Sequence, residues 1–474
     1  MANELSPVKN RYFYFLIAGI FLIIISRAFL SDGLFMDGMM YATMARNLAH
    51  GLGTFWEPHL TDTFFPQFIN HPPLAIWLES LLFRILGDNR FVERIYSVSA
   101  IILTAYIITS IWKELGNTRR SAWLPLLFWI AMPTITWASV NNMLENTMGI
   151  FVCLSVLFCL FSFRQRKIYF AILSGMMLTL GFLTKGPVTF FPISFPVFYW
   201  ISTRKINFGK AVTTTIIITT SALLFLATLY FLTPAREIFP KYLGITFSLT
   251  FNDATKSSRF YIIGMFLKEM IPTAIILALM IARGLRKGIT PGILKTNISA
   301  ALAFFFLGLS GVLPLMITRV QSGYYYQTSL AFFAIASALF IQPVLEDLLS
   351  RQTRSLKGIK IFSVISVLIL ATGIILSLAY TGTINRDRQL IRDTRIIIPQ
   401  LEENSTVSIL PAMAANWSIH VYFARNANIS LDPDTANDHN YIIVQNNIAS
   451  DDILKKYERT GPETGFISLY RKKQ

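Results

Sequence analysis

Long apolar runs separated by short polar segments recur along most of the chain. Runs of roughly 20 apolar residues have the length at which an α-helix crosses a bilayer. Such runs lie near residues 12–30, 94–112, 121–139, 147–163, 168–184, 187–202, 211–232, 260–282, 297–317, 324–342 and 360–380. Helices are the expected spans, because backbone groups in lipid must be hydrogen-bonded within their own segment and no series of short alternating strands suggests a barrel. The pattern predicts an all-α polytopic membrane protein with about 11 transmembrane helices.

The composition agrees with this class of protein. Of the 474 residues, 53% are hydrophobic and only 14% are charged, whereas a soluble domain carries about 25% charged residues. The net charge of +16 would suit a nucleic-acid-binding protein, but its distribution favours another explanation. If the N-terminus is cytoplasmic, every expected cytoplasmic segment carries at least two lysines or arginines, as the positive-inside rule requires. We therefore expect no nucleic-acid partner, a multi-pass protein of the inner (plasma) membrane surrounded by its lipids, and a C-terminus on the periplasmic or extracellular side.

The first expected external segment, residues 31–93, is too long to be a simple connector. Apolar residues recur at the i, i+3, i+4, i+7 spacing of an amphipathic helix within 38–50 and again within 72–86. Helices of this kind fit a membrane surface, with their apolar faces toward the lipid. The segment is therefore expected to hold two amphipathic juxtamembrane helices.

The composition changes after the last expected span. In residues 382–474 the apolar runs shorten to STVSIL, HVYFA, YIIVQ and FISLY, between clusters of Asn, Asp and Pro. Short runs bounded by turn residues predict strands. We expect two domains, namely a transmembrane domain over 1–381 that includes the external segment 31–93, and a small soluble α/β extracytoplasmic domain over 382–474. Another external segment, about 233–259, is expected to be polar.

Two acids are the leading candidates for a catalytic carboxylate. Asp37 follows the first span directly and precedes the helix expected over 38–50. Glu145, in NNMLENTMG, lies where a short loop enters the fourth span, on the same expected side of the membrane. Both are equally suited to capping a helix start, where acids are favoured. The two roles are compatible, because a carboxylate fixed at a helix start is a preorganised base.

Several candidate anion-binding residues lie on the same expected side. Lys185, in FLTKGPVTFFP, ends the fifth span against the charge bias, and Arg319 stands between spans nine and ten. Tyr325 belongs to a run of three tyrosines after Arg319, and His71 precedes a Pro-Pro pair. The alternatives are a snorkelling lysine, an interfacial aromatic belt and a simple turn histidine.

Three further ionisable residues are weaker candidates. Arg94 begins the second span, where an interfacial arginine that snorkels is an equally good explanation. Lys268 and Glu269 lie in the outer half of the eighth span, and ionisable residues at that depth are commonly functional.

Carboxylates and cations gathered at one membrane face suit one kind of chemistry. A carboxylate can accept the proton of an attacking hydroxyl or amine. Cations can stabilise a departing phosphate, whose charge grows in the transition state. This combination describes group transfer from a lipid-linked phosphate donor. A divalent metal ion held by Asp37, Glu145 and His71 would be compatible with it, although no metal-ligand spacing is present.

These features resemble the C-type membrane glycosyltransferases, and most of all the branch of protein O-mannosyltransferases and the aminoarabinose transferase that modifies lipid A. The resemblance covers roughly residues 10–345 and rests on several motifs in order: Asp37 followed by Tyr41 and Ala45-Arg46, HPPL at 71–74 with Trp77, Gly87, Glu93-Arg94, LTKG ending in Lys185-Gly186, Pro272, and Arg319 before the tyrosines.

The resemblance implies an inverting transferase that moves a sugar from a polyprenyl-phosphate donor to a glycolipid, polysaccharide or protein acceptor on the external face. Asp37 would be the principal catalytic carboxylate and Glu145 a second acid, where the family usually has Asp. Lys185 and Arg319 would hold the donor phosphate. The aminoarabinose enzymes have Lys just before the Pro-Pro pair, where this chain has His71, so the resemblance does not imply specificity for lipid A.

Two other functions remain as alternatives. A secondary transporter usually places ionisable groups near the bilayer midplane, often in two related halves. Here the charges gather at one face, and the two halves show no similarity. An oligosaccharide ligase or polymerase with a diphosphate-linked donor would share the chemistry, and only the family likeness separates it from the leading function.

Overall fold

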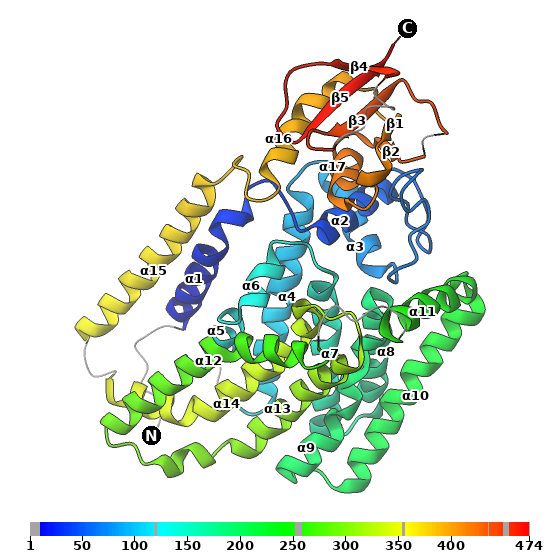
Figure 1. The fold of residues 1–474 in the computed structure, drawn as a ribbon. Coiled ribbons are helices and arrows are strands. Elements are labelled where there is room, and N and C mark those ends of the chain that lie inside the picture. Colours follow the sequence, from blue (N-terminus) through cyan, green and yellow to red (C-terminus); the bar gives the residue numbers. More distant parts are fainter. Residues whose placement is uncertain are drawn as a thin grey trace. The chain divides into compact units, whose positions relative to one another are not determined.

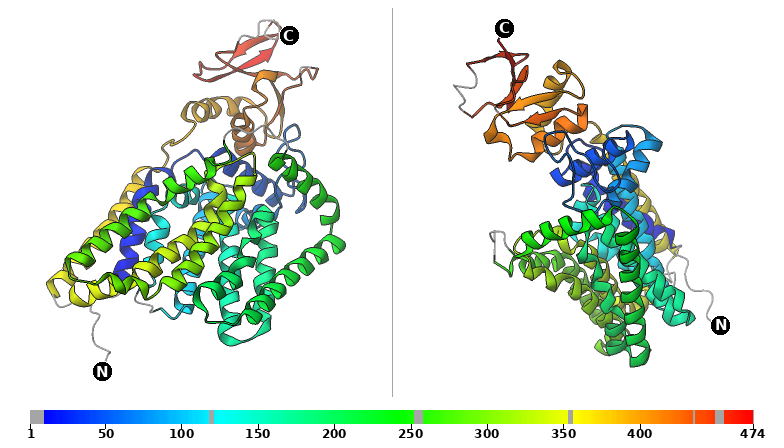
Figure 2. Two further views of the ribbon diagram at one scale, coloured as in Figure 1. Left: turned by 60° about the horizontal axis from the view of Figure 1, so that its bottom comes forward. Right: turned by 90° about the vertical axis from the view of Figure 1, so that its right-hand side faces the viewer.

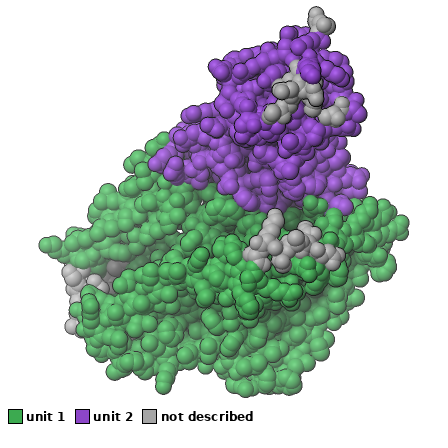
Figure 3. Space-filling model, in the orientation of Figure 1, with its two compact units in different colours: residues 1–26, 70–72, 97–379 green, residues 27–69, 73–96, 380–474 purple. Residues whose placement is uncertain are grey.

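The computed structural model describes residues 10–117, 121–251, 258–352, 356–434, 436–448 and 455–473. The chain forms two compact units, which Figure 3 shows in different colours. Unit 1 comprises residues 1–26, 70–72 and 97–379, and unit 2 comprises 27–69, 73–96 and 380–474. The helices and strands of both units are drawn in Figure 1, and each unit is described by itself below.

Nine helical segments of the described residues are long and apolar enough to cross a membrane. They are α1 (Arg11–Phe29), α4 (Val92–Glu114), α7 (Leu144–Gln165), α8 (Ile168–Lys185), α10 (Phe208–Leu232), α12 (Tyr261–Arg286), α13 (Ile298–Val312) with η4 (Leu313–Ile317), η5 (Gly323–Tyr326) with α14 (Gln327–Gln352), and α15 (Leu356–Ala379). The predicted helical polytopic membrane fold is therefore confirmed.

Two of the expected spans are interrupted helices. The run at 121–139 is divided into α5 (Leu124–Ile130) and α6 (Pro133–Ser139), and the run at 187–202 into the 3-10 helix η2 (Pro187–Ser194) and α9 (Phe195–Thr203). Proline is the physical reason, because it lacks the N–H that continues an α-helix and its ring clashes with the preceding turn. Pro133 begins α6, and η2 contains Pro192. Neither run reaches the length of a single uninterrupted span.

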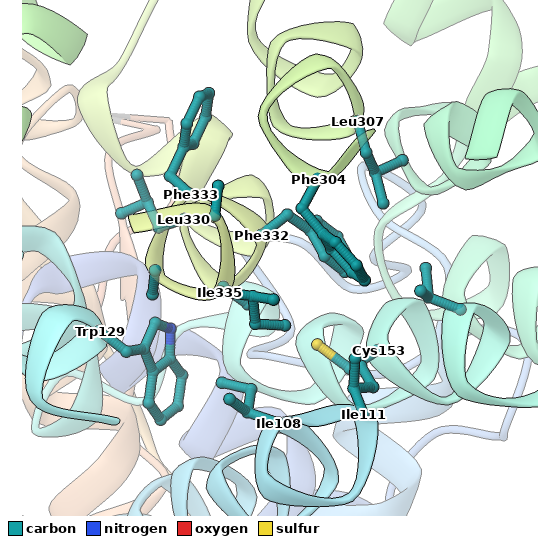
Figure 4. Close-up of a cluster of buried hydrophobic side chains, with 14 of the residues drawn as sticks. Ile108, Ile111, Trp129, Cys153, Phe304, Leu307, Leu330, Phe332, Phe333 and Ile335 are labelled. Atoms are coloured by element: carbon teal, nitrogen blue, oxygen red, sulfur yellow. The ribbon is translucent and has the colours of Figure 1, made fainter. Parts of the chain in front are cut away.

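The core of unit 1 is built around α14. In the apolar window of Gly323–Leu349, 94% of the residues are buried, whereas the corresponding share for α15 is 17%. Figure 4 shows Phe332 and Phe333 of α14 among buried side chains from other helices, including Phe304, Trp129 and Cys153. A helix that is apolar on every side can be covered by protein or by lipid, and α14 is covered by protein.

The segment expected to be a polar connection over 233–259 contains a helix. This helix, α11 (Ala235–Phe251), begins after Pro234 and buries Ile238, Phe239 and Tyr242. The spacing of these apolar residues is helical, so the segment has a buried face despite its charged residues. Residues 252–257 of the expected segment lie outside the described residues.

Unit 2 contains the two helices expected in the first loop (residues 31–93). They are α2 (Met36–Ala49) and α3 (Leu74–Leu86), and they pack against each other. Every residue of α2 from Gly38 to Leu48 is buried, because α17 (Trp417–Ala427) packs on it as well. The apolar positions of α2 are thus covered by protein within this unit.

The tail (residues 382–474) forms the predicted small α/β fold, with a five-stranded sheet in the order β2-β1-β3-β5-β4. Its strands are β1 (Thr406–Ile409), β2 (Ser430–Asp432), β3 (Tyr441–Gln445), β4 (Tyr457–Thr460) and β5 (Ile467–Lys472). β1 is parallel to β2 and β3, whereas β5 is antiparallel to β3 and β4. Figure 2 shows this sheet, in orange and red, from two further sides.

The prediction of a strand at HVYFA is wrong, because this segment is helical. The tail also contains three elements that the sequence did not predict. HVYFA belongs to α17, in which residues 419–425 are buried without interruption. A continuous apolar run of this length does not distinguish a buried strand from a buried helix. The additional elements are α16 (Arg388–Ile397), β2 and β4. STVSIL, YIIVQ and FISLY are confirmed as strand regions.

Hydrogen bonds join the first loop to the tail within unit 2. The Arg46 guanidinium donates to the carbonyls of Ala424 and Arg425 at 2.9 and 3.2 Å. The Thr63 hydroxyl donates to the Leu431 carbonyl at 2.8 Å, and the Asp62 N–H donates to the Ser430 hydroxyl at 3.1 Å. The first loop therefore packs with the tail in one compact unit. The division into two domains at residue 382 stays a prediction.

The stability of unit 2 is expected to depend on pH through His420. Its ring stacks on Phe64 with centroids 4.4 Å apart, and burial lowers the pKa of His420 to about 4. The unfolded chain, with an ordinary histidine pKa of about 6.5, therefore binds more protons between pH 4 and 6.5, and stability falls as the pH drops through that window. Between pH 7.5 and 5.5 the loss is about 1 kcal/mol.

Thermal unfolding of the full chain in detergent at these two pH values measures this effect. His420→Gln cannot take up the proton, so its midpoint should fall less than that of the wild type. The wild type and the variant share every other titratable group, which makes the difference specific to this ring. An identical pH dependence for the two proteins would contradict the prediction.

Candidate active site

In unit 1, an ion pair joins the ends of two adjacent antiparallel helices. Lys185 is the last residue of α8, and its Nζ donates to Oε1 of Glu145 in the first turn of α7. The side chain of Glu145 is fully buried, and that of Lys185 is 9% exposed. Each charge lies at the helix end that favours it, with the acid at an N-terminus and the cation at a C-terminus.

Two tyrosine rings also surround the Lys185 ammonium. Its Nζ lies 5.3 Å from the ring centroid of Tyr324 and 5.4 Å from that of Tyr325, both in η5. Trp137 of α6 stacks on Tyr324 with centroids 5.7 Å apart. Rings at this distance attract a cation through their quadrupole, so they stabilise the charged lysine. The tyrosines thus contact Lys185, which an aromatic belt at the lipid interface would not require.

The turn after Lys185 requires glycine. Gly186 has a φ of +88°, and a Cβ at this position would lie 1.7 Å from the Tyr242 hydroxyl oxygen. That hydroxyl donates to the Lys185 carbonyl at 3.2 Å, and the Gly186 N–H donates to the Phe182 carbonyl at 2.7 Å. Glycine supplies both the positive φ and the space for Tyr242. The turn therefore fixes the backbone that carries the lysine.

His71 also lies in unit 1, and the charge of Lys185 affects its pKa. Loss of hydration, and then the Lys185 ammonium, lower the pKa of His71 to about 3. The imidazole is consequently neutral at physiological pH, with one nitrogen that donates and one that accepts. Four of the candidate residues, Lys185, Glu145, Tyr325 and His71, are thus brought together by the structure, while their functional roles stay predictions.

The other candidates of unit 1 have different surroundings. Arg319 is half-buried, and its backbone N–H donates to the Thr250 carbonyl at 3.2 Å. Glu269 accepts hydrogen bonds from the N–H and hydroxyl of Thr134 at 2.6 and 2.9 Å, at the start of α6. Lys268 is exposed. Glu269 therefore stabilises the broken helix pair α5–α6, and its contacts explain its burial without a substrate.

In unit 2, Asp37 is the second residue of α2 and is half-buried. The cap residue of this helix is Phe35, so Asp37 lies in the first turn without being the cap itself. A carboxylate there is stabilised by the positive end of the helix. The position thus holds the Asp37 carboxylate at the start of a helix.

Arg94 fixes the backbone that leads into α2. Its guanidinium donates to the carbonyls of Ser31 and Gly33 at 3.0 and 2.9 Å. The residue is only 4% exposed, which excludes a snorkelling arginine whose charged end lies in water. Arg94 therefore holds the segment ahead of Asp37 in place.

A cavity of about 490 Å³ lies in unit 2 between the first loop and the tail helices. Asp32 at its wall accepts from Arg90 at 3.0 Å and also from Arg395. Arg425 pairs with Asp88 at 2.8 Å and with Glu93 at 3.2 Å. The apolar part of the wall is formed by Leu34, Met39, Ile391, Ile398 and Pro399. Paired charges beside an apolar wall suit a polar molecule with an apolar face.

Sequence reasoning did not identify the tail residues of this cavity. Arg395 and Arg425 stand in helices of the tail, and their partners lie more than 300 residues earlier in the chain. No local motif marks such a pairing. Among the described residues, no group of three or more His, Cys, Asp or Glu side chains that could hold a metal ion is found, so no metal ligands are assigned.

The Glu145–Lys185 pair generates a stability prediction. Lys185→Met leaves the Glu145 carboxylate buried without its cation, and breaking a buried pair in this way costs about 3 to 5 kcal/mol. We expect the thermal midpoint in detergent to fall by several degrees, and the double variant Lys185→Met/Glu145→Gln to recover most of that loss. Equal destabilisation of the single and double variants would show that the two charges are not coupled.

Part of the chain is similar in sequence to known glycosyltransferases. Residues 70–251 match the family model described as dolichyl-phosphate-mannose-protein mannosyltransferase. Over 181 residues the chain is 22% identical to the undecaprenyl phosphate-alpha-4-amino-4-deoxy-L-arabinose arabinosyl transferase of Wigglesworthia glossinidia brevipalpis. That match covers 37% of this chain and 31% of the relative, which is about a third of the relative's length.

The fold is similar to that of solved structures over nearly its whole length. The crystal structure of ArnT from Cupriavidus metallidurans bound to undecaprenyl phosphate matches with a TM-score of 0.64 and 13% identity, over 96% of this chain and 97% of the other. The same protein in the apo state matches with a TM-score of 0.65 and 14% identity over the same shares. The sequence match over residues 70–251 and the fold match over almost the entire chain confirm the resemblance to the C-type membrane glycosyltransferases.

Proposed function

We propose that the protein is an inverting glycosyltransferase that moves a sugar from a polyprenyl-phosphate donor to a glycolipid, polysaccharide or protein acceptor. The observation that carries this proposal is the buried Lys185 cluster of unit 1, where a cation is held at the end of an apolar helix. The relatives support it, because one matched fold was solved with undecaprenyl phosphate and the curated relative is named for a sugar carried on that lipid.

Lys185 is assigned to the phosphate of the donor. When the bond between the anomeric carbon and the phosphate oxygen breaks, that oxygen keeps the electron pair and gains negative charge. A preorganised cation stabilises this charge without reorganising during the reaction. The neutral His71 and the Tyr325 hydroxyl can donate hydrogen bonds to phosphate oxygens, and Arg319 is a further cation for the same group. Glu145 orients Lys185, and it is therefore a positioning residue in this scheme.

Asp37 is assigned as the general base. It accepts the proton of the acceptor hydroxyl or amine while that atom forms a bond to the anomeric carbon from the side opposite the phosphate. Attack from that side inverts the configuration. The half-buried position in the first turn of α2, with Arg94 anchoring the preceding backbone, supports this role because it holds the carboxylate in a fixed place at the positive end of the helix.

The cavity of unit 2 is assigned to the acceptor. Sugars present pairs of hydroxyl groups and an apolar ring face, and this cavity combines paired acids and arginines with an apolar wall. Asn426, which lines the cavity and is exposed, can both donate and accept a hydrogen bond. A saccharide of a glycolipid or polysaccharide acceptor fits this chemistry best.

The proposed orientation places the N-terminus in the cytoplasm and the tail outside. Basic residues at the helix ends support it, because they gather in the connections expected to be cytoplasmic. In the same scheme the protein has a transmembrane domain over 1–381, with its catalytic loop at 31–93, and an extracytoplasmic domain over 382–474.

Asp37→Asn is expected to lower the rate of sugar transfer by roughly 10²- to 10⁴-fold, the contribution of a general base. Asparagine has nearly the same size and removes only the interaction of the charge with the helix end, about 0.3 to 1 kcal/mol, so the thermal midpoint should fall by a few degrees at most. Transfer is measured with purified protein in proteoliposomes that contain a radiolabelled polyprenyl-phosphate sugar. Asp62→Asn, an exposed acid of the same loop, is the matched control and should keep wild-type transfer. Near-normal transfer by Asp37→Asn would exclude the assigned base.

Donor and acceptor binding should be affected by different variants. Lys185→Ala removes a charged contact, so the KM for the donor is expected to rise about tenfold or more while the acceptor KM changes little. Asn426→Ala removes one neutral hydrogen bond, so the acceptor KM should rise about fivefold with an unchanged donor KM. Asn447→Ala, an exposed tail residue that does not line the cavity, is the control. An effect of Lys185→Ala confined to the acceptor KM would contradict the assignment.

A further inference from the structure

A second cavity lies in unit 1, at the opposite ends of α7 and α8 from the Lys185 cluster. Its volume is about 630 Å³, and it is bordered by the connection from α7 to α8 and the connection from α9 to α10. The end of α9 and the start of α10 lie at the bottom of Figure 1. The lining residues belong entirely to unit 1, so the cavity is a property of that unit alone.

The charged side chains that line this cavity are all basic. They are Arg166, Lys167, Lys205 and Lys210. Among the described residues, none of the four forms an ion pair with an acid. Their neighbour Arg164 differs, because it pairs with Glu114 at 3.0 Å and does not line the cavity. Lys210 Nζ donates to the Phe163 carbonyl at 3.0 Å. Four cations without an acid beside them in the described part of the chain attract an anion into the hollow.

Two helix N-termini border the same cavity and add to the positive potential. α8 begins at Ile168 directly after Lys167, and α10 begins at Phe208 directly after Asn207. The first N–H groups of a helix have no partner within the helix and carry partial positive charge. The Asn207 side chain satisfies one of them, the Lys210 N–H at 2.7 Å, whereas Lys167 makes no such cap for α8. Phosphate groups bind to sites of this kind.

The cavity also has an apolar wall. Ile168, Ala171, Ile206 and Ile217 line it beside the basic residues. Ile168 is 62% exposed, and the helix that it begins is long and apolar enough to span the bilayer. An apolar surface next to a cationic hollow suits a ligand that carries both a phosphate and a hydrocarbon chain. Inorganic phosphate alone would leave this apolar wall in contact with water.

We propose that this basic cavity (Arg166, Lys167, Lys205 and Lys210) binds the phosphate headgroup of an anionic membrane lipid, with the acyl chains beside the exposed apolar residues in the first turns of α8, namely Ile168, Tyr169 and Ile172. In the orientation proposed above this cavity faces the cytoplasm, where basic pockets between transmembrane helices bind anionic headgroups. The site is separate from the proposed transfer reaction, and its occupancy does not depend on a sugar donor. It gives the protein a specific contact with the charged lipid of one leaflet.

Native mass spectrometry of the purified full chain tests this site. The delipidated protein in detergent is titrated with phosphatidylglycerol, with phosphatidylcholine, and with inorganic phosphate as a competitor. Each basic residue near an anionic headgroup contributes about fivefold in affinity. Arg166→Gln/Lys205→Gln should therefore weaken phosphatidylglycerol binding by roughly 25-fold, while phosphatidylcholine binds weakly to both proteins.

The matched control is Arg286→Gln/Lys295→Gln, which removes the same charge from exposed residues that do not line the cavity. It should change the affinity less than threefold. Equal losses in the two double variants would overturn the site in favour of a general charge effect. Equal binding of the two lipids by the wild type would overturn it as well. Displacement of the lipid by equimolar inorganic phosphate would identify a free-phosphate site and reject the lipid.

Discussion

A charged side chain remains stable inside a helical membrane bundle only when an opposite charge and suitable dipoles are built into the same place. The hairpin of α7 and α8 meets this requirement, because its antiparallel helices bring the first turn of one beside the last turn of the other. Glu145 and Lys185 occupy these two ends. The glycine turn beside Tyr242 fixes the backbone that carries the lysine, and two tyrosine rings lie around its ammonium. The chemistry proposed for the donor phosphate thus rests on the ends of rigid helices.

Buried arginines of unit 2 likewise have carbonyl or carboxylate partners around them. A long first loop has many backbone carbonyls and few regular hydrogen bonds, so it needs donors from elsewhere. Arg94 supplies them to the segment before α2. In the other direction, Arg46 of the loop donates to carbonyls of α17. Arg425 is neutralised by Asp88 and Glu93. Buried guanidinium groups with several donors each are suited to satisfying irregular backbone in this way.

The sequence predicted the features that depend on local pattern. Apolar periodicity located α2 and α3, and the charge bias along the chain singled out Lys185 as an unusual cation. The break at Pro133 within the run 121–139 was not predicted. Hydropathy measures how apolar each residue is, and it does not register that proline lacks a backbone N–H. HVYFA was misread as a strand because burial on all sides removes the helical period.

What depends on distant pairing could not be predicted. Arg425 contacts Glu93 across 332 positions of the chain, and nothing near either residue signals the other. The cavity of unit 2 is made by such pairs, so it became visible only in the folded unit. Lys185 and Glu145, by contrast, are 40 positions apart and lie in adjacent helices of one hairpin. Topology alone placed both at the same membrane face.

Arg46 contacts the tail largely through the main chain, because it donates to the carbonyls of Ala424 and Arg425. Every amino acid provides a carbonyl, so most substitutions in this part of α17 keep these two acceptors. The contact therefore constrains the path of the backbone far more than the identity of the side chains. This part of α17 can consequently change its side chains while one arginine of the first loop still binds its backbone in the same register.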